Sequence, residues 1–283
     1  MMQERSGRHM RRKVTNYVMM AVCGMATLFT IGILLLVIGY TLVNGLSYLN
    51  LDFITQTARP LGEAGGGMRH EIIGTLILVT IATVIGVPVG MMAGIFLSEF
   101  GSNKVGTMVR LMADVLTGVP SIVTGIFVYV LVVRPMGTFS AMAGGIALAI
   151  IMLPVVARTT EEMMRLVPVT YREAALALGI PRWRMIVSVV IPGAIVGIVT
   201  GIMLSVARIA GETAPLIFTA LGNTFGFAGL TEPIAAMPLQ IWRYAMSAYD
   251  SLHQQAWAAS FLLVLVVLLI SLGVRWVTSR RYH

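Results

Sequence analysis

Arg208 and Glu212 are charged residues within a long apolar stretch of the sequence, residues 186–221. If this stretch crosses a membrane, the arginine costs about 2.5–3.5 kcal/mol on insertion scales, so it should face water or a polar partner. The guanidinium group presents a fork of donors that matches the oxygens of phosphate, whereas lysine presents only a point charge. The pair therefore predicts a site that binds or passes an anion, with the neighbouring Thr213 on the same path.

A simpler interpretation of these charges stays open. A spacing of four places Arg208 and Glu212 on one helix face, where the two can neutralise each other and serve only packing. Arg158 is the second candidate for the anion path, but it can equally be a basic anchor at the end of a membrane span. Glu212 could also accept a hydrogen bond from protonated phosphate, which would disfavour sulfate. Asp114 follows Arg110 by four residues and is expected to form a local ion pair with it.

The sequence predicts no enzymatic site in this chain. A phosphate-binding P-loop requires Gly-Lys followed by Ser or Thr, but Lys13 and Lys104, the only lysines, are each followed by valine. ATP and Mg should therefore be bound by another chain if ATP supplies the energy. The four histidines are dispersed, and neither a nucleophile–base set nor metal-ligand spacing is present. We expect no metal site and no cofactor in the chain itself.

The composition predicts a membrane protein. Hydrophobic residues make up 57% of the chain and charged residues only 11%, whereas a soluble domain carries about 25% charged residues. Lipid should therefore cover much of the surface. The net charge of +8 does not indicate nucleic-acid binding, because the basic residues lie between the apolar runs rather than on one polar module.

Six apolar segments are long enough to cross a bilayer, which takes about 20 helical residues. They are residues 17–43, 71–97, 111–133, 141–157, 186–221 and 256–277. The predicted fold class is all-α, a polytopic membrane protein with six transmembrane helices. Pro120 can bend the third segment, and Gly211 and Pro215 can break or bend the fifth.

The distribution of lysine and arginine predicts the orientation. Most basic residues lie on one side of the membrane when the N-terminus is placed inside, so both termini are expected in the cytoplasm. The resulting organisation is a cytoplasmic tail at 1–16, a first helix at 17–43, a periplasmic loop at 44–70, a core at 71–277 and a cytoplasmic tail at 278–283.

The longest cytoplasmic segment of the core, at about 158–192, contains local helix signals. Thr170 and Glu173 have the spacing of a capping box, in which each side chain satisfies a backbone amide of the other. Gly179 can provide a left-handed stop, and Pro181 can open a second short helix. We therefore expect a short capped helix, a sharp turn, and a second helix that enters the membrane.

This segment resembles the EAA loop of ABC-importer permeases. The matching positions are Glu173, Ala174, Ala175, Gly179 and the run Val189-Val190-Ile191-Pro192. That family prefers isoleucine at position 189 and leucine at position 191, so the differences are conservative. The resemblance implies a type I ABC-importer permease fold, in which the loop docks into a cleft of a separate ATPase subunit. An ordinary amphipathic connector is the alternative.

Three further segments resemble the A-type permease subunit of the bacterial phosphate ABC importer. They are RIAGETAPLIF at 208–218, DVLTGVPSIVTG at 114–125 and RTTEEMMRLVP at 158–168. The similarity covers about residues 70–260. It implies a permease subunit that moves inorganic phosphate across the bacterial inner membrane by alternating access. The implied partners are a related C-type permease, a dimeric ATP-binding subunit and a periplasmic phosphate-binding protein.

Three other functions are weighed against this one. A permease for another oxyanion, sulfate or molybdate, would use the same arginine chemistry and differ only in selectivity. An ion-coupled secondary transporter would work without ATP, and the EAA spacing argues against it. A membrane enzyme lacks support because no catalytic set is predicted.

Overall fold

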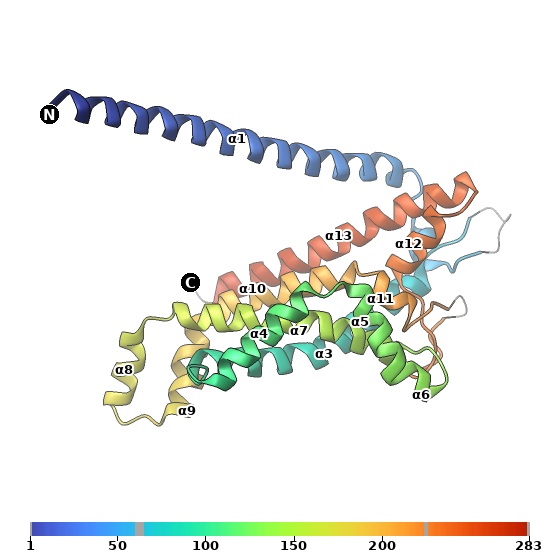
Figure 1. The fold of residues 1–283 in the computed structure, drawn as a ribbon. Coiled ribbons are helices and arrows are strands. Elements are labelled where there is room, and N and C mark those ends of the chain that lie inside the picture. Colours follow the sequence, from blue (N-terminus) through green and yellow to red (C-terminus); the bar gives the residue numbers. More distant parts are fainter. Residues whose placement is uncertain (1, 60–64, 224–225, 282–283) are drawn as a thin grey trace.

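The computed structural model describes residues 2–59, 65–223 and 226–281. Residues 60–64, in the expected outer loop, and 282–283, in the expected C-terminal tail, lie outside this part of the chain. The described residues are mostly helical (Figure 1), and their only strand-like feature is one isolated bridge between Leu221 and Ile234. The predicted all-α class is confirmed.

The chain forms thirteen α-helices and two π-helical turns within the described residues. The α-helices are α1 Met2–Leu46, α2 Leu51–Thr55, α3 Arg69–Glu99, α4 Lys104–Gly118, α5 Ser121–Val128, α6 Arg134–Met136, α7 Ala141–Leu166, α8 Val169–Ala177, α9 Arg182–Met185, α10 Ile191–Ala210, α11 Ala214–Ile217, α12 Met237–Ala245 and α13 Asp250–Arg281. The π-helical turns, Tyr129–Val133 and Ile186–Val190, join α5 to α6 and α9 to α10. Five of the described helical segments could each span a membrane. The segments Lys104–Gly118 and Ser121–Met136, which meet at a sharp bend, make a sixth span if they are counted together.

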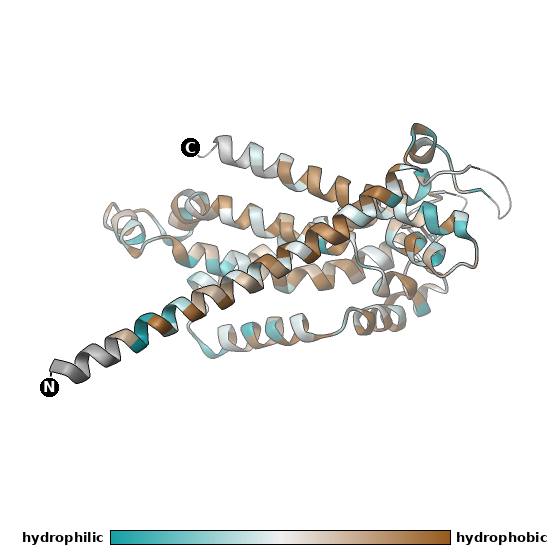
Figure 2. Cartoon of the chain, turned by 90° about the horizontal axis from the view of Figure 1, so that it is seen from above, coloured by the Kyte–Doolittle hydropathy of each residue, from teal (hydrophilic) through white to brown (hydrophobic). Residues whose placement is uncertain are grey.

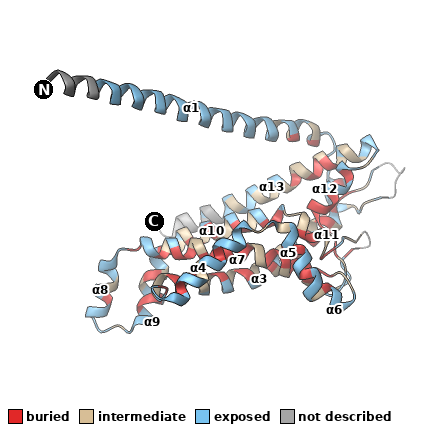
Figure 3. Cartoon of the chain, viewed as in Figure 1, coloured by how far each residue is buried: buried red, intermediate tan, exposed pale blue. Residues whose placement is uncertain are grey.

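The centre of the bundle is the contact between α3 and α7. Glycines recur every four residues along α3, and a Cβ atom at Gly94 would lie 2.5 Å from Cβ of Thr160. Gly90 approaches Val156 in the same way. Small residues at this spacing let two helix backbones come close without a hydrophobic driving force. Buried residues accordingly concentrate along these two helices (Figure 3).

The third expected span is bent far more sharply than a kinked helix. The helical segments 104–118 and 121–136 meet at 103°, so the apolar segment expected at 111–133 is broken at Pro120, where a bend was predicted. Pro120 disfavours helical geometry at the residue before it. Val119 is accordingly extended, with φ −71° and ψ 129°.

Two other helix ends differ from the expected boundaries. The helix that begins at Ala141 continues to Leu166 rather than ending near residue 157, so Arg158 lies inside α7. α10 ends at Ala210, and only the short α11 follows within the expected span 186–221. Gly211 and Pro215 therefore break this segment, as predicted.

The first helix stands away from the rest of the chain (Figure 1), and much of it is coloured as hydrophobic (Figure 2). Its side chains are exposed from Met10 to Ile38 although most of them are apolar. The C-terminal end of α1 meets α13, and there the rings of Tyr40 and Trp257 form an edge contact with centroids 5.1 Å apart. An apolar surface of this length requires lipid or another chain to cover it.

Candidate anion path and coupling segment

Arg208 lies on the exposed face of α10, near its end. Its Nε atom is 4.0 Å from Oε1 of Glu212, with the side chains 48% and 17% exposed. Val196, Thr200 and Leu204 are also exposed and precede Arg208 at four-residue intervals, so they share its side of the helix. The ion pair is long, which leaves guanidinium donors of Arg208 available beside it.

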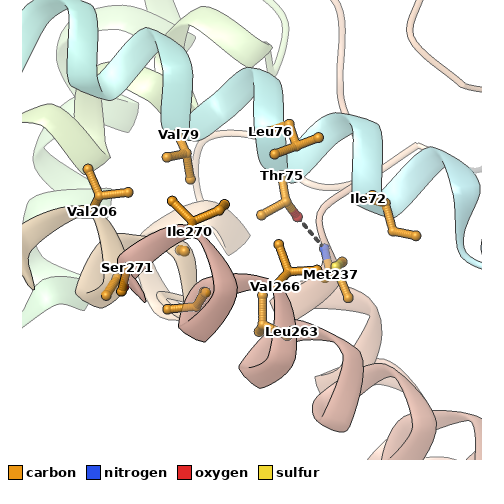
Figure 4. A pocket seen from close by; sticks show the side chains of 13 residues that line it. Ile72, Thr75, Leu76, Val79, Val206, Met237, Leu263, Val266, Ile270 and Ser271 are labelled. Carbon is orange, nitrogen blue, oxygen red and sulfur yellow. Dashed lines mark hydrogen bonds between the residues drawn. The ribbon is translucent and has the colours of Figure 1, made fainter. Parts of the chain in front are cut away.

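The opposite side of α10 borders an apolar cleft between α3 and α13 (Figure 4). Val206 and Ala210 line this cleft, and at about 100° per residue each lies about 160° around the helix from Arg208. The Thr75 hydroxyl is occupied because it accepts a hydrogen bond from the Met237 amide at 2.8 Å. Among the residues that the structure describes, no charged side chain lines the cleft, so it does not suit an anion.

Arg158 is fully engaged with two carboxylates. Its Nε and Nη2 atoms donate to Asp114 of α4, and Nη1 donates to Oε2 of Glu161 at 3.3 Å. The predicted local pair between Arg110 and Asp114 is therefore wrong. The two residues share a helix, but Arg110 reaches across to Glu161, because that carboxylate is buried and stabilises an arginine more strongly.

Glu161 is the centre of an ion cluster that the sequence did not reveal. Its side chain is only 2% exposed, and it accepts from Arg110 and Arg165 at 2.7 Å each, besides Arg158. The three arginines outnumber the two carboxylates of the cluster, Glu161 and Asp114, by one charge. The sequence did carry one signal for this cluster: Arg158 and Arg165 lie three and four residues from Glu161 on α7, the spacings at which helix side chains can pair.

The two candidate arginines lie at different levels of the bundle. α7 and α10 run antiparallel, with Gly201 facing Thr159 and the Ser205 hydroxyl 3.5 Å from the Met152 carbonyl. This register places Arg208 and Arg158 on the order of 10 Å apart along the helix axes, at 1.5 Å per residue. They are separate positions rather than one paired site.

The three family-like segments contact one another. A Cβ atom at Gly125 would lie 2.6 Å from Cα of Pro215, so α5 and α11 touch only because residue 125 is glycine. The Arg158–Asp114 pair joins the segment 158–168 to the segment 114–125. Thr213 precedes α11, is half-buried, and makes no side-chain capping bond.

The predicted capping box at α8 is wrong. The helix begins at Val169, its N-cap is Pro168, and no side chain caps it. Thr170 and Glu173 lie inside the helix with exposed side chains. Pro168, with φ −56°, already has the backbone angle that leads into a helix, so the helix starts two residues earlier than an N-cap at Thr170 would place it.

The turn after α8 agrees with the prediction. Gly179 has φ +75°, a left-handed conformation, and the amide of Ile180 donates to the carbonyl of Ala175 at 3.2 Å. Ala175 is buried against the α9–α10 segment, whereas Glu173 and Ala174 face outward. The helix thus presents Glu173 and Ala174 to solvent while Ala175 anchors it.

A second ion pair fixes this segment to α3. Arg172 donates to Oε1 of Glu99 at 3.0 Å and to the carbonyls of Met164 and Val167 at the end of α7. Arg182 donates to the Glu99 carbonyl, and its guanidinium lies 4.6 Å from the ring centre of Phe100. The α8–α9 turn is therefore bound to the ends of both central helices.

No group of three or more His, Cys, Asp or Glu residues able to hold a metal occurs in the described part of the chain. Long apolar helices, broken spans and an exposed arginine on a membrane helix instead define a polytopic membrane transport subunit. The chain matches, over residues 86–281, the family model described as binding-protein-dependent transport system inner membrane component. It belongs to this family.

Curated relatives match almost the whole chain. A Yersinia pestis protein named phosphate transport system permease protein PstA is 42% identical, covering 100% of this chain and 96% of its own length. The protein of the same name from Xylella fastidiosa strain Temecula1 is 44% identical, with coverages of 94% and 93%. The resemblance found in the motifs is thereby confirmed.

Solved structures agree on the fold. A chain of the inward-facing MetNI methionine ABC transporter superposes with a TM-score of 0.59 at 19% identity, covering 75% of this chain and 92% of that chain. An amino acid ABC transporter gives a TM-score of 0.53 at 18% identity. The type I ABC-importer permease fold is therefore confirmed.

Proposed function

We propose that this chain is the permease subunit of an ATP-driven importer of inorganic phosphate. The observation that carries the proposal is the near-complete match to phosphate transport permeases, together with an exposed arginine, Arg208, on a membrane helix. The protein crosses the bacterial inner membrane several times, with both termini in the cytoplasm.

The route for phosphate contains two successive arginines. Phosphate first meets Arg208, with Glu212 and Thr213 beside it, and then passes to the level of Arg158. Glu212 keeps the empty position at Arg208 from being strongly positive, because its carboxylate lies 4.0 Å from the Arg208 guanidinium. Forked guanidinium donors at both levels suit a tetrahedral oxyanion.

The energy comes from a partner. A dimeric ATP-binding subunit binds ATP and Mg, and its cleft receives α8, with Glu173 and Ala174 at the contact. Ala175 and Gly179 give the segment a fixed shape, since one is buried and the other forms the left-handed turn. Closure of the ATPase moves this segment, and a related C-type permease completes the path by alternating access.

A periplasmic phosphate-binding protein delivers the substrate. The test is uptake of radiolabelled phosphate into proteoliposomes that contain the permease pair, the ATP-binding subunit and the binding protein. We expect uptake that requires internal ATP and is not inhibited by excess sulfate or molybdate. Uptake without ATP would indicate a secondary transporter, and equal inhibition by sulfate or molybdate would indicate a different oxyanion importer.

A further inference from the structure

Arg158 has no free nitrogen for a substrate in this structure. Nε donates to Asp114 at 3.0 Å, Nη2 donates to both oxygens of the same carboxylate, and Nη1 donates to Glu161. A carboxylate that spans two guanidinium nitrogens occupies the same edge that a phosphate would use. Phosphate can therefore make a two-nitrogen contact with Arg158 only if one carboxylate leaves.

The two carboxylates differ in how firmly they are bound. Glu161 is 2% exposed and has two further arginine partners, Arg110 and Arg165, both at 2.7 Å. Asp114 is 57% exposed, and within the described part of the chain its side-chain hydrogen bonds are all with Arg158. An exposed carboxylate is readily solvated when it leaves its partner, whereas a buried one is not. Asp114 is the group that can exchange.

The charge balance favours the same exchange. With Asp114 and Glu161 in place, the three arginines of the cluster leave one positive charge uncompensated. When Asp114 swings into the aqueous path, the Arg158 edge becomes an open cationic site next to the fixed Glu161. Glu161 prevents the site from retaining an anion too strongly, because its charge lies 3.3 Å from Nη1.

We propose that Asp114 is an internal competitor of phosphate: it occupies Arg158 when the path is empty, yields to the substrate, and on returning displaces phosphate from the permease. This proposal rests on the proposed function, because it concerns the same path. It adds a positioning residue that acts by controlling when Arg158 is available. The return of Asp114 assists phosphate release, while the direction of transport comes from the ATP-driven alternating access.

The test measures phosphate affinity at the permease itself. The complete permease–ATPase complex, without binding protein or nucleotide, is placed in nanodiscs and titrated with radiolabelled phosphate. Asp114→Asn should bind phosphate about fivefold more tightly than the wild type, the effect of releasing one partly exposed ion pair. Asp114→Asn combined with Arg158→Gln should lose the gain, and Asp114→Glu, which keeps the charge, should stay near wild type.

Glu162→Gln is the matched control. It removes the same charge from an exposed position of α7, next to the cluster but in none of its ion pairs, and should leave affinity unchanged. An assembled Asp114→Asn complex with unchanged or weaker affinity overturns the proposal. So does failure of both Asp114→Asn and Asp114→Ser to assemble, because Asp114 would then be structural rather than exchangeable.

The two proposals fail separately. If wild-type proteoliposomes import no phosphate, the proposed function is wrong. If they import phosphate but the Asp114 variants bind phosphate with wild-type affinity, the proposed function stands and Asp114 is not a competitor.

Discussion

Arg172 in α8 and Glu99 at the end of α3 form an ion pair, with Nη2 and Oε1 3.0 Å apart and the side chains 16% and 5% exposed. The two residues belong to different functional parts. Arg172 lies in the segment proposed to dock on the ATPase, and Glu99 ends the helix that packs most closely against α7. This pair offers a direct link through which a movement of α8 can reach the centre of the bundle.

Glu99→Gln should uncouple ATP hydrolysis from transport. The amide keeps the shape but removes the charge, and a hydrogen bond between charged groups is about 1 kcal/mol stronger than a neutral one. We expect phosphate transported per ATP to fall about fivefold, with hydrolysis continuing. The measurement is parallel uptake and hydrolysis in proteoliposomes, with the exposed Glu232→Gln as control. A ratio equal to wild type would show that the pair transmits nothing.

Gly94→Ala should destabilise the bundle. The new Cβ would lie 2.5 Å from Thr160 Cβ and 2.6 Å from the Ala157 carbonyl, and overpacking of this kind costs about 1–3 kcal/mol. Thermal unfolding in detergent checks it, with a lower Tm expected. Gly24→Ala is the control, because nothing lies within 4 Å of that position; equal Tm values for both variants would contradict the packing argument.

Gly179→Ala should weaken the turn after α8. Residue 179 has φ +75° with open space around it, so the cost of about 1–2 kcal/mol comes from the left-handed backbone rather than from a clash. Binding of the isolated ATP-binding subunit to permease nanodiscs should weaken. Gly179→Asn should weaken it less, since asparagine tolerates this conformation. If both bind like wild type, the turn is not needed for docking.

Glu161→Gln should reduce stability more than any exposed carboxylate variant. Three arginines would lose their shared counter-charge, and removing one partner of a buried pair costs about 3 kcal/mol or more. The Tm of the purified complex checks this against Glu162→Gln on the same helix. A Tm loss no larger than that of the control would mean that the cluster contributes little.

The elements of the fold could be predicted because apolar runs and helix breakers act locally. The broken end of α10 at Gly211 and the turn at Gly179 follow from the residues themselves. The angle at Pro120 could not be predicted in this way. Proline specifies that a helix stops, but the 103° bend depends on α5 packing against Pro215, far away in the sequence.

The candidate residues were chosen by residue type and the Arg208–Glu212 pair by its local spacing, but the partners of Arg158 were not predicted. Arg208 and Arg158 were identified because a guanidinium group in or at the end of an apolar span is costly unless it faces water or a polar partner. The pairs around Arg158 depend on tertiary structure: Arg158 and Asp114 are 44 residues apart. Arg110 and Glu161 are 51 residues apart, whereas local spacing had suggested Asp114 as the partner of Arg110. The capping box failed for a related reason, because Pro168 begins the helix before Thr170 can cap it.

The central claim is that phosphate passes Arg208, and one measurement tests it most directly. Initial rates of ATP-dependent phosphate uptake are compared in proteoliposomes with wild type, Arg208→Gln and, as a control for loss of one arginine, Arg12→Gln in the exposed N-terminal part of α1. We expect Arg208→Gln to lower uptake by about tenfold or more, the loss of one charge-assisted contact, in a complex that assembles normally. Uptake by Arg208→Gln at the wild-type rate would contradict the account.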